Sequence, residues 1–115
     1  MTENGELYNV DGNSNRVAAI CFGPKSVVVV AGVNKLVPDI AAALDRVRRM
    51  AAPANAIRRE RTTYCAEMGE CLACSKPGAS GCTSEGRIYC SFVVHAFQRE
   101  RDRIKVILVG EPLGF

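Results

Sequence analysis

The sequence predicts an α/β domain with a parallel or mixed sheet and flanking helices. Three neighbouring features predict it: four consecutive valines at Val27–Val30, a Gly-Val-Asn-Lys turn at Gly32–Lys35, and apolar residues at three- and four-residue steps after Pro38. A strand, a glycine turn and a helix followed by later strands are typical of layered α/β folds with at least one right-handed crossover. We therefore expect Val27–Val30 to be the central strand, buried on both faces.

The segment before the valines predicts one strand and one short helix. Leu7–Val10 is apolar and aromatic, and residues 11–15 after it favour a tight turn, which predicts a strand. Val17–Phe22 fits a strand or a helix. Ala18 and Ala19, together with the Gly-Pro pair that follows, favour a short helix.

The middle of the chain predicts an amphipathic helix that begins near Pro38 and Asp39, two residue types suited to a helix N-terminus. Its predicted apolar face consists of Ile40, Ala43, Leu44, Val47 and Met50, and its polar side of Asp45, Arg46, Arg48 and Arg49. Pro53 should interrupt this pattern, with a second short helix at Ala54–Glu60. Ile88–Phe97 and Ile104–Val109 then predict two strands, joined by the charged turn Gln98–Arg103 and paired antiparallel.

Length and charge restrict the possible functions. The 115 residues fit one domain, residues 1–115, and the formal net charge is +3. The basic residues of Arg46–Arg61 and Arg99–Lys105 alternate with acids, as on a solvated helix face, so we expect no nucleic-acid partner. Val27–Val33, the longest apolar stretch, is much shorter than the about 20 residues of a membrane-spanning helix. Met1–Asn9 is polar and lacks the pattern of a secretory signal, which favours a cytoplasmic location.

Several motifs follow one another in the order found in one protein family. They lie at Gly5–Gly12, Asn15–Ala19, Phe22–Lys25, Ala31–Lys35, Ala51–Ala56, Cys65–Cys74 and Val109–Phe115. In this order they resemble the C-terminal half of the LUD (lactate utilisation) domain. The resemblance extends over nearly the whole chain, and an ordered series of motifs is far more specific than any one of them.

The resemblance implies a fold similar to that of glucosamine-phosphate deaminases, ribose-phosphate isomerases and coenzyme A transferases, with ligands at the C-terminal ends of parallel strands. It also implies a role in oxidising lactate to pyruvate beside an iron–sulfur partner, and it leaves open whether this chain is itself an enzyme. The family's segments before Gly5 are absent from the sequence. Another lactate-utilisation subunit, or a second copy of the chain, is therefore expected to cover an exposed edge or face of the sheet.

The cysteines of residues 62–90 have a spacing typical of metal ligands. Cys65, Cys71 and Cys74 form C-x5-C-x2-C, one residue longer than the C-x4-C-x2-C of plant-type ferredoxins. Thiolates suit an iron–sulfur cluster or zinc, and free thiols are the remaining alternative. The Ser75–Gly86 insertion leaves open whether Cys82 or Cys90 is a fourth ligand.

Two polar turns are candidates for binding a carboxylate or a phosphate. Gly32, Asn34 and Lys35 lie where a strand gives way to a helix, so backbone N–H groups and an ammonium could converge on an anion. The other turn contributes Asp11, Gly12, Asn15 and Arg16, with Arg16 as a carboxylate clamp. Ordinary capped turns are the alternative for both. The resemblance adds Glu111 as a site carboxylate.

Two other reactive side chains have simpler interpretations. Cys21 is expected to be a small buried hydrophobic residue beside an apolar run, and His95 to pack in the core or at a sheet edge. Two functions therefore remain. One is a LUD-type domain that serves oxidation of lactate or a related organic acid, with an iron–sulfur cluster. The other is a non-enzymatic scaffold that binds a partner and carries structural zinc or free thiols.

Overall fold

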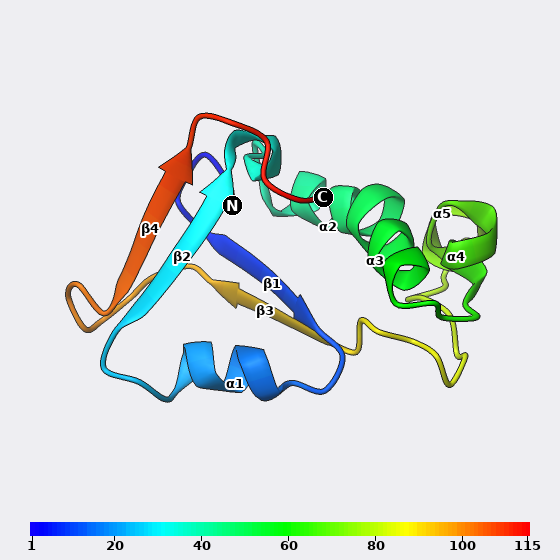
Figure 1. Ribbon diagram of the computed structural model, residues 1–115, viewed down its shortest axis with the longest axis horizontal. Coiled ribbons are helices and arrows are strands. Elements are labelled where there is room, and N and C mark those ends of the chain that lie inside the picture. Colours follow the sequence, from blue (N-terminus) through cyan, green and yellow to red (C-terminus); the bar gives the residue numbers. More distant parts are fainter.

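The computed structural model describes residues 1–115 as a small mixed α/β domain with two separate two-stranded sheets (Figure 1). Strand β1 (Leu7–Asp11) pairs antiparallel with β3 (Ser91–His95), and β2 (Val27–Gly32) pairs parallel with β4 (Ile104–Val109). The predicted antiparallel pairing of the last two strands is wrong. Each of them instead pairs with an earlier strand, so both sheets join the two ends of the chain.

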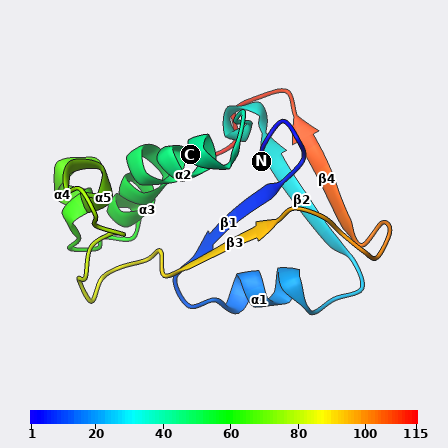
Figure 2. The same cartoon turned by 180° about the vertical axis from the view of Figure 1, so that it is seen from behind.

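Helix α1 (Asn15–Cys21) confirms the helical interpretation of this segment. Its buried residues, Val17 and Ile20, are three positions apart and so lie on one face. The helix lies along the β1–β3 sheet in both views (Figures 1 and 2). Together, β1, β3 and α1 form a small packed unit, which we call the covered unit.

The amphipathic helix begins where the sequence predicted. The 3₁₀ turn η1 (Val33–Lys35) follows β2, and α2 (Ile40–Arg46) starts after Asp39, whose Oδ1 accepts a hydrogen bond from the Ala42 N–H at 2.8 Å. Asp39 is therefore the N-cap.

Pro53 does not interrupt the helix. A π-helical turn, η2 (Val47–Ala51), leads directly into α3 (Ala52–Arg58), and Pro53 stands in the first turn of α3. A wide turn leaves N–H positions that proline can occupy without losing a required hydrogen bond. The predicted second helix at Ala54–Glu60 thus begins earlier and continues the first.

The cysteine-rich segment contains two short helices, α4 (Tyr64–Met68) and α5 (Leu72–Ser75). Residues 76–90 then run without regular structure back to β3 (Figure 1). Ala52, Ala56 and Cys65 form a small buried cluster between α3 and α4.

The β2–β4 sheet contradicts the prediction of a central strand buried on both faces. β2 has one neighbour, β4, and Val28 and Val30 are 57% and 56% exposed. Burial of a parallel strand on both faces requires layers above and below it, and no helix covers this face. Met50, assigned to the apolar helix face, is likewise 52% exposed, because the π turn shifts it away from Ala43. None of the helices combines the length and apolar character needed to cross a bilayer.

Candidate functional site

Two adjoining cavities lie between the helical segment 40–58 and the ends of β1 and β2. The larger, of about 600 Å³, contains five arginines, and the smaller, of about 250 Å³, contains three basic side chains. Arg16, Tyr89 and Phe115 line both cavities. We call the two together the basic groove. Its basic residues are Arg16, Lys35, Arg46, Arg58, Arg59, Arg61 and Arg87, and its acidic residues are Asp11 and Glu85.

Arg16 is held in place at the boundary between the cavities. Its Nη1 donates to Asn9 Oδ1 at 3.1 Å and its Nη2 donates to the Val10 carbonyl at 2.7 Å. Its Nε lies 3.8 Å from Asp11 Oδ2. Because the side chain is still 53% exposed, an orientated guanidinium remains accessible in the groove.

Asp11 has a structural role. Its Oδ1 accepts from the Asn13 N–H, and its Oδ2 accepts from the N–H groups of Arg16 and Val17. Burial, the largest single influence, raises the pKa of this carboxyl, but the backbone hydrogen bonds and the Arg16 charge outweigh it, so the net pKa is lowered. Asp11 therefore caps α1 as a carboxylate.

The Gly32–Lys35 turn holds the last residues of the chain. Asn34 Nδ2 donates to the Gly114 carbonyl at 2.8 Å, and the Leu113 N–H donates to Asn34 Oδ1 at 3.1 Å. A Cβ on Gly32 would stand 2.4 Å from the Leu113 nitrogen. Gly32 and Asn34 are thus occupied in packing, and from this turn Lys35 lines the groove.

Arg46 contributes a donor without a partner. Its Nε donates to the Asn34 carbonyl at 3.0 Å, whereas its Nη2 is buried and has no hydrogen-bond partner. Arg46 lines the smaller cavity together with Lys35 and Arg16. A buried N–H without a partner is costly, so Arg46 retains hydrogen-bonding capacity that the rest of the chain does not use.

The opposite wall is partly aromatic. Arg58 donates from Nε and Nη2 to Asn55 Oδ1 at 3.2 and 2.8 Å, and its guanidinium lies 5.6 Å from the centre of the Phe115 ring. Tyr89 donates its hydroxyl to the Ala51 carbonyl at 3.0 Å. Burial raises the pKa of Tyr89, which keeps the hydroxyl protonated as this donor.

The structure brings most of the predicted anion-binding residues to the groove. Asp11, Gly12, Asn15 and Arg16 line the larger cavity, and Lys35 joins Arg16 in the smaller. Glu111 is exposed and lines neither cavity. Sequence reasoning missed the arginines that converge here from distant segments, namely Arg46, Arg58, Arg59, Arg61 and Arg87. The available signal was the basic run of residues 46–61, which was interpreted as a solvated helix face.

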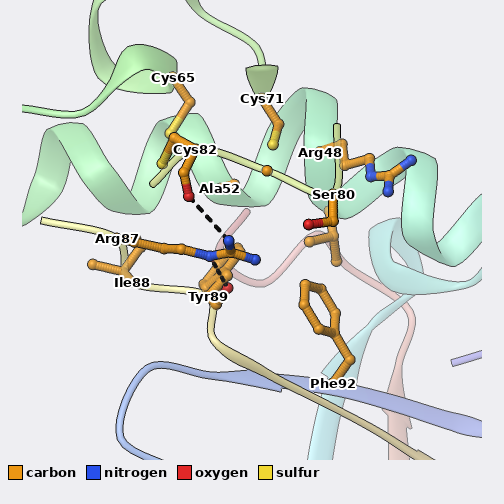
Figure 3. A pocket seen from close by; sticks show the side chains of 12 residues that line it. Arg48, Ala52, Cys65, Cys71, Ser80, Cys82, Arg87, Ile88, Tyr89 and Phe92 are labelled. Carbon is orange, nitrogen blue, oxygen red and sulfur yellow. Dashed lines mark hydrogen bonds between the residues drawn. The ribbon is translucent and has the colours of Figure 1, made fainter. Parts of the chain in front are cut away.

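The five cysteines of residues 62–90 divide among three places. Cys65, Cys71 and Cys82 line a small apolar pocket of about 40 Å³ beneath η2, with Tyr89 and Phe92 on its far side (Figure 3). Cys74 follows Cys71 in the chain but does not line this pocket. Cys90 is exposed, and its N–H donates to the Asp11 carbonyl at 2.9 Å, at the start of β3.

A metal site is not shown among these cysteines, and an iron–sulfur cluster or zinc on them stays a prediction. The structure contains no group of three or more histidine, cysteine, aspartate or glutamate side chains placed to hold a metal. Burial, the largest influence, raises the pKa of the Cys74 thiol.

Cys21 and His95 form a contact that the sequence did not predict. The interpretation of Cys21 as a buried hydrophobic residue is wrong, because it follows the buried Ile20 and falls outside that face of α1. Its Sγ lies 3.5 Å from His95 Nε2. His95, the last residue of β3, therefore has a reactive neighbour despite its place in an apolar strand.

Comparison with known families gives one result. The model of the LUD domain, a family associated with lactate-utilisation proteins, matches residues 1–109 of the 115. No curated protein and no solved structure matches the chain significantly. The match extends from the residues before β1 to the end of β4, and so includes both sheets and every residue of the basic groove except Phe115. The chain therefore belongs to the LUD domain family.

Proposed function

We propose that the chain binds a small organic anion in the basic groove and serves the oxidation of lactate, or of a related organic acid, to pyruvate. Membership in the LUD family supports the coarser role in lactate utilisation. The observation that carries the proposal is the charge of the groove, where seven basic side chains face two acidic ones.

The chemistry of these side chains favours a carboxylate or a phosphate. A guanidinium presents two parallel N–H groups that match the two oxygens of a carboxylate. Arg16 is already orientated by Asn9 and Val10, so binding costs little side-chain entropy. Arg46 lines the smaller cavity together with Arg16 and Lys35, so we place the carboxylate there.

In this proposal residues 1–115 act as one LUD-type unit in the cytoplasm, as a subunit or accessory of an iron–sulfur oxidoreductase system. Its partners are other lactate-utilisation subunits or a second copy of the chain. An iron–sulfur cluster on residues 62–90 stays a prediction, for which the arrangement of the cysteines gives no support. Metal analysis after anaerobic purification tests it: iron with acid-labile sulfide supports the cluster, and zinc supports a structural site.

A scaffold without enzymatic activity is the second candidate, favoured by the exposed β2–β4 sheet. Val28, Val30 and Ile107 are each more than half exposed, and their strand pairing places all three on one face. Parallel strands in stable proteins are normally covered, so this face suits a protein partner. Cross-linking or ultracentrifugation that shows the purified chain to be monomeric under all conditions would argue against this candidate.

Titration calorimetry tests anion binding directly. L-lactate, pyruvate and inorganic phosphate are the probes, and lactamide, which lacks the charge of lactate, is the control. We expect at least one anion to bind, lactamide not to bind, and Arg46→Gln to weaken binding roughly tenfold through loss of a charge-assisted hydrogen bond. Arg101→Gln, at a side chain that is 96% exposed and lies outside the groove, is the matched control variant. Equal affinities for lactate and lactamide would refute the proposal.

A further inference from the structure

A second cluster of reactive side chains lies outside the basic groove, at the end of the covered unit. Along β3, Ser91 and His95 lie on the strand face that turns to α1: the hydroxyls of Ser91 and Ser14 are hydrogen-bonded, and His95 Nε2 meets Cys21 Sγ at 3.5 Å. Phe92 and Val94, on the alternate positions, are exposed on the other face. Strand register and helix length therefore bring the imidazole and the thiol together.

The imidazole has one partner, the thiol. His95 Nδ1 is buried and has no hydrogen-bond partner, while Nε2 contacts Cys21 Sγ. A neutral imidazole that carries its proton on Nδ1 accepts a proton at Nε2. Cys21 is itself an exposed residue and lines a cavity open to solvent. A nucleophile within hydrogen-bond reach of a base is the arrangement that activates cysteine.

The surroundings of Cys21 are basic. Cys21 lines a cavity of about 300 Å³ with Lys25, Arg99 and Arg103, opposed by Glu100. Arg103 is structural, because its Nη1 donates to the Ile20 carbonyl at 2.8 Å and its Nε donates to the Pro24 carbonyl at 3.2 Å. Lys25 and Arg99 are exposed at the rim. This cavity favours a negatively charged reaction partner.

We propose that Cys21 is a nucleophilic thiol that exchanges with small anionic disulfides, such as glutathione disulfide, with His95 as its base. The Cys21 proton passes to His95 Nε2, and Sγ attacks one sulfur of the disulfide. The S–S bond of the reagent breaks as the new Sγ–S bond forms, and one glutathione thiolate leaves and takes up a proton. Cys21 is oxidised to a mixed disulfide, and the reagent is reduced. Thiols reduce the mixed disulfide and restore the Cys21 thiol, so Cys21 is a site of reversible redox modification.

Cys90 is the internal reference for the test. It is also exposed, but its Sγ contacts the Arg87 carbonyl at 3.7 Å and not a histidine. The folded chain is treated with limiting glutathione disulfide, and each cysteine is quantified by peptide mass spectrometry over time. We expect Cys21 to react roughly tenfold faster than Cys90, and His95→Gln to remove that advantage. Equal rates at Cys21 and Cys90 in the unaltered protein would overturn the proposal, even if His95→Gln failed to fold.

A second comparison isolates the charge of the cavity. Lys25→Ala combined with Arg99→Ala should slow the reaction of Cys21 with glutathione disulfide severalfold and leave its reaction with uncharged hydroxyethyl disulfide unchanged. Arg101→Ala removes a neighbouring charge that does not line the cavity, and it should change neither rate. A double variant that slows both reagents equally would overturn the selection for anions. A His95→Gln protein that is folded, as judged by its thermal unfolding, and reacts at the original rate would overturn the role of His95.

Discussion

The covered unit and the β2–β4 sheet show what a helix layer does for two strands. In the covered unit, α1 packs Val17 and Ile20 against β1–β3, and Leu7 is only 6% exposed. In the β2–β4 sheet, by contrast, Val28 and Val30 remain more than half exposed. An antiparallel pair tolerates one wet face, whereas a parallel pair depends on layers on both sides. The free energy of folding is therefore concentrated in the covered unit and around α3.

The most direct test of this difference is to make the same substitution, valine to alanine, at one site in each region. Val17→Ala, at a residue 3% exposed, should lower the free energy of unfolding by roughly 2 kcal/mol through lost burial and a cavity. Val30→Ala, at a residue 56% exposed, should cost less than about 0.5 kcal/mol. Urea unfolding followed by circular dichroism measures both. Similar losses at the two sites would mean that the β2–β4 face is covered in solution.

The next prediction concerns the contribution of the β2–β4 sheet to the stability of the fold. A Cβ at Gly32 would meet the Leu113 nitrogen at 2.4 Å and the Glu111 carbonyl oxygen at 2.5 Å, both of them backbone atoms. Gly32→Ala should therefore cost about 1–3 kcal/mol by overpacking. Gly110→Ala is the matched control, since a Cβ there meets nothing within 4 Å. Thermal unfolding that ranks the two variants equally would contradict the contact between Gly32 and residues 111–113.

The third prediction concerns the cap that joins β1 to α1. Asp11→Asn should lower the unfolding midpoint, because the carboxylate accepts from three backbone N–H groups. The folded-state pKa of Asp11 is lowered, so this stabilisation is complete above the unfolded-state pKa and is lost as the pH falls through the folded-state value. Urea midpoints of both proteins from neutral pH to about pH 2 should converge at the acid end. A difference that stays constant with pH would exclude the charge as its cause.

The smallest expected effect concerns the basic groove, to which both the covered unit and the turn after β2 contribute residues. Lys35 lies in the turn after β2 and Arg16 in the first turn of α1, yet both line one cavity. Lys35→Ala should weaken the binding of lactate, pyruvate or phosphate by about three- to tenfold, with less effect on folding, because Lys35 is partly exposed. Ligand-induced shifts of the melting temperature measure it, with Lys76→Ala outside the groove as the control. Shifts unchanged by Lys35→Ala would exclude Lys35 from the site.

Local features of the fold could be predicted from the sequence, and tertiary ones could not. Neighbouring residues, which the sequence shows directly, determine the helix start near Pro38 and Asp39, the strand at Leu7–Val10 and the short helix predicted within Val17–Phe22. β1, the partner of β3, is separated from it by most of the chain. Residues such as Phe92 and Val94 favour a strand but do not indicate which other strand it pairs with. Four valines in a row indicate burial only when other layers exist to cover them.

The candidate site was predictable to the same extent. Arg16 and Lys35 were identified because each stands in a turn beside a strand or helix end, where donors converge. Arg87 reaches the groove because residues 76–90 run back to β3, which no spacing rule indicates, whereas Arg58 and Arg61 reach it from the end of α3 and the turn after it. The same return path places Cys82 in the pocket that Cys65 and Cys71 line, and Cys74 does not line that pocket.

The π turn at Val47–Ala51 has a consequence for how this helix tolerates changes in length. Counted along the chain, its inward-facing positions Ala43, Val47, Ala52 and Ala56 are separated by four, five and four residues. A wide turn absorbs the extra residue, and the buried seam stays straight. A chain without the exposed Met50 would have a uniform four-residue spacing. It should fold as an uninterrupted α-helix with the same seam, so a deletion here is less disruptive than one in α2 or α3.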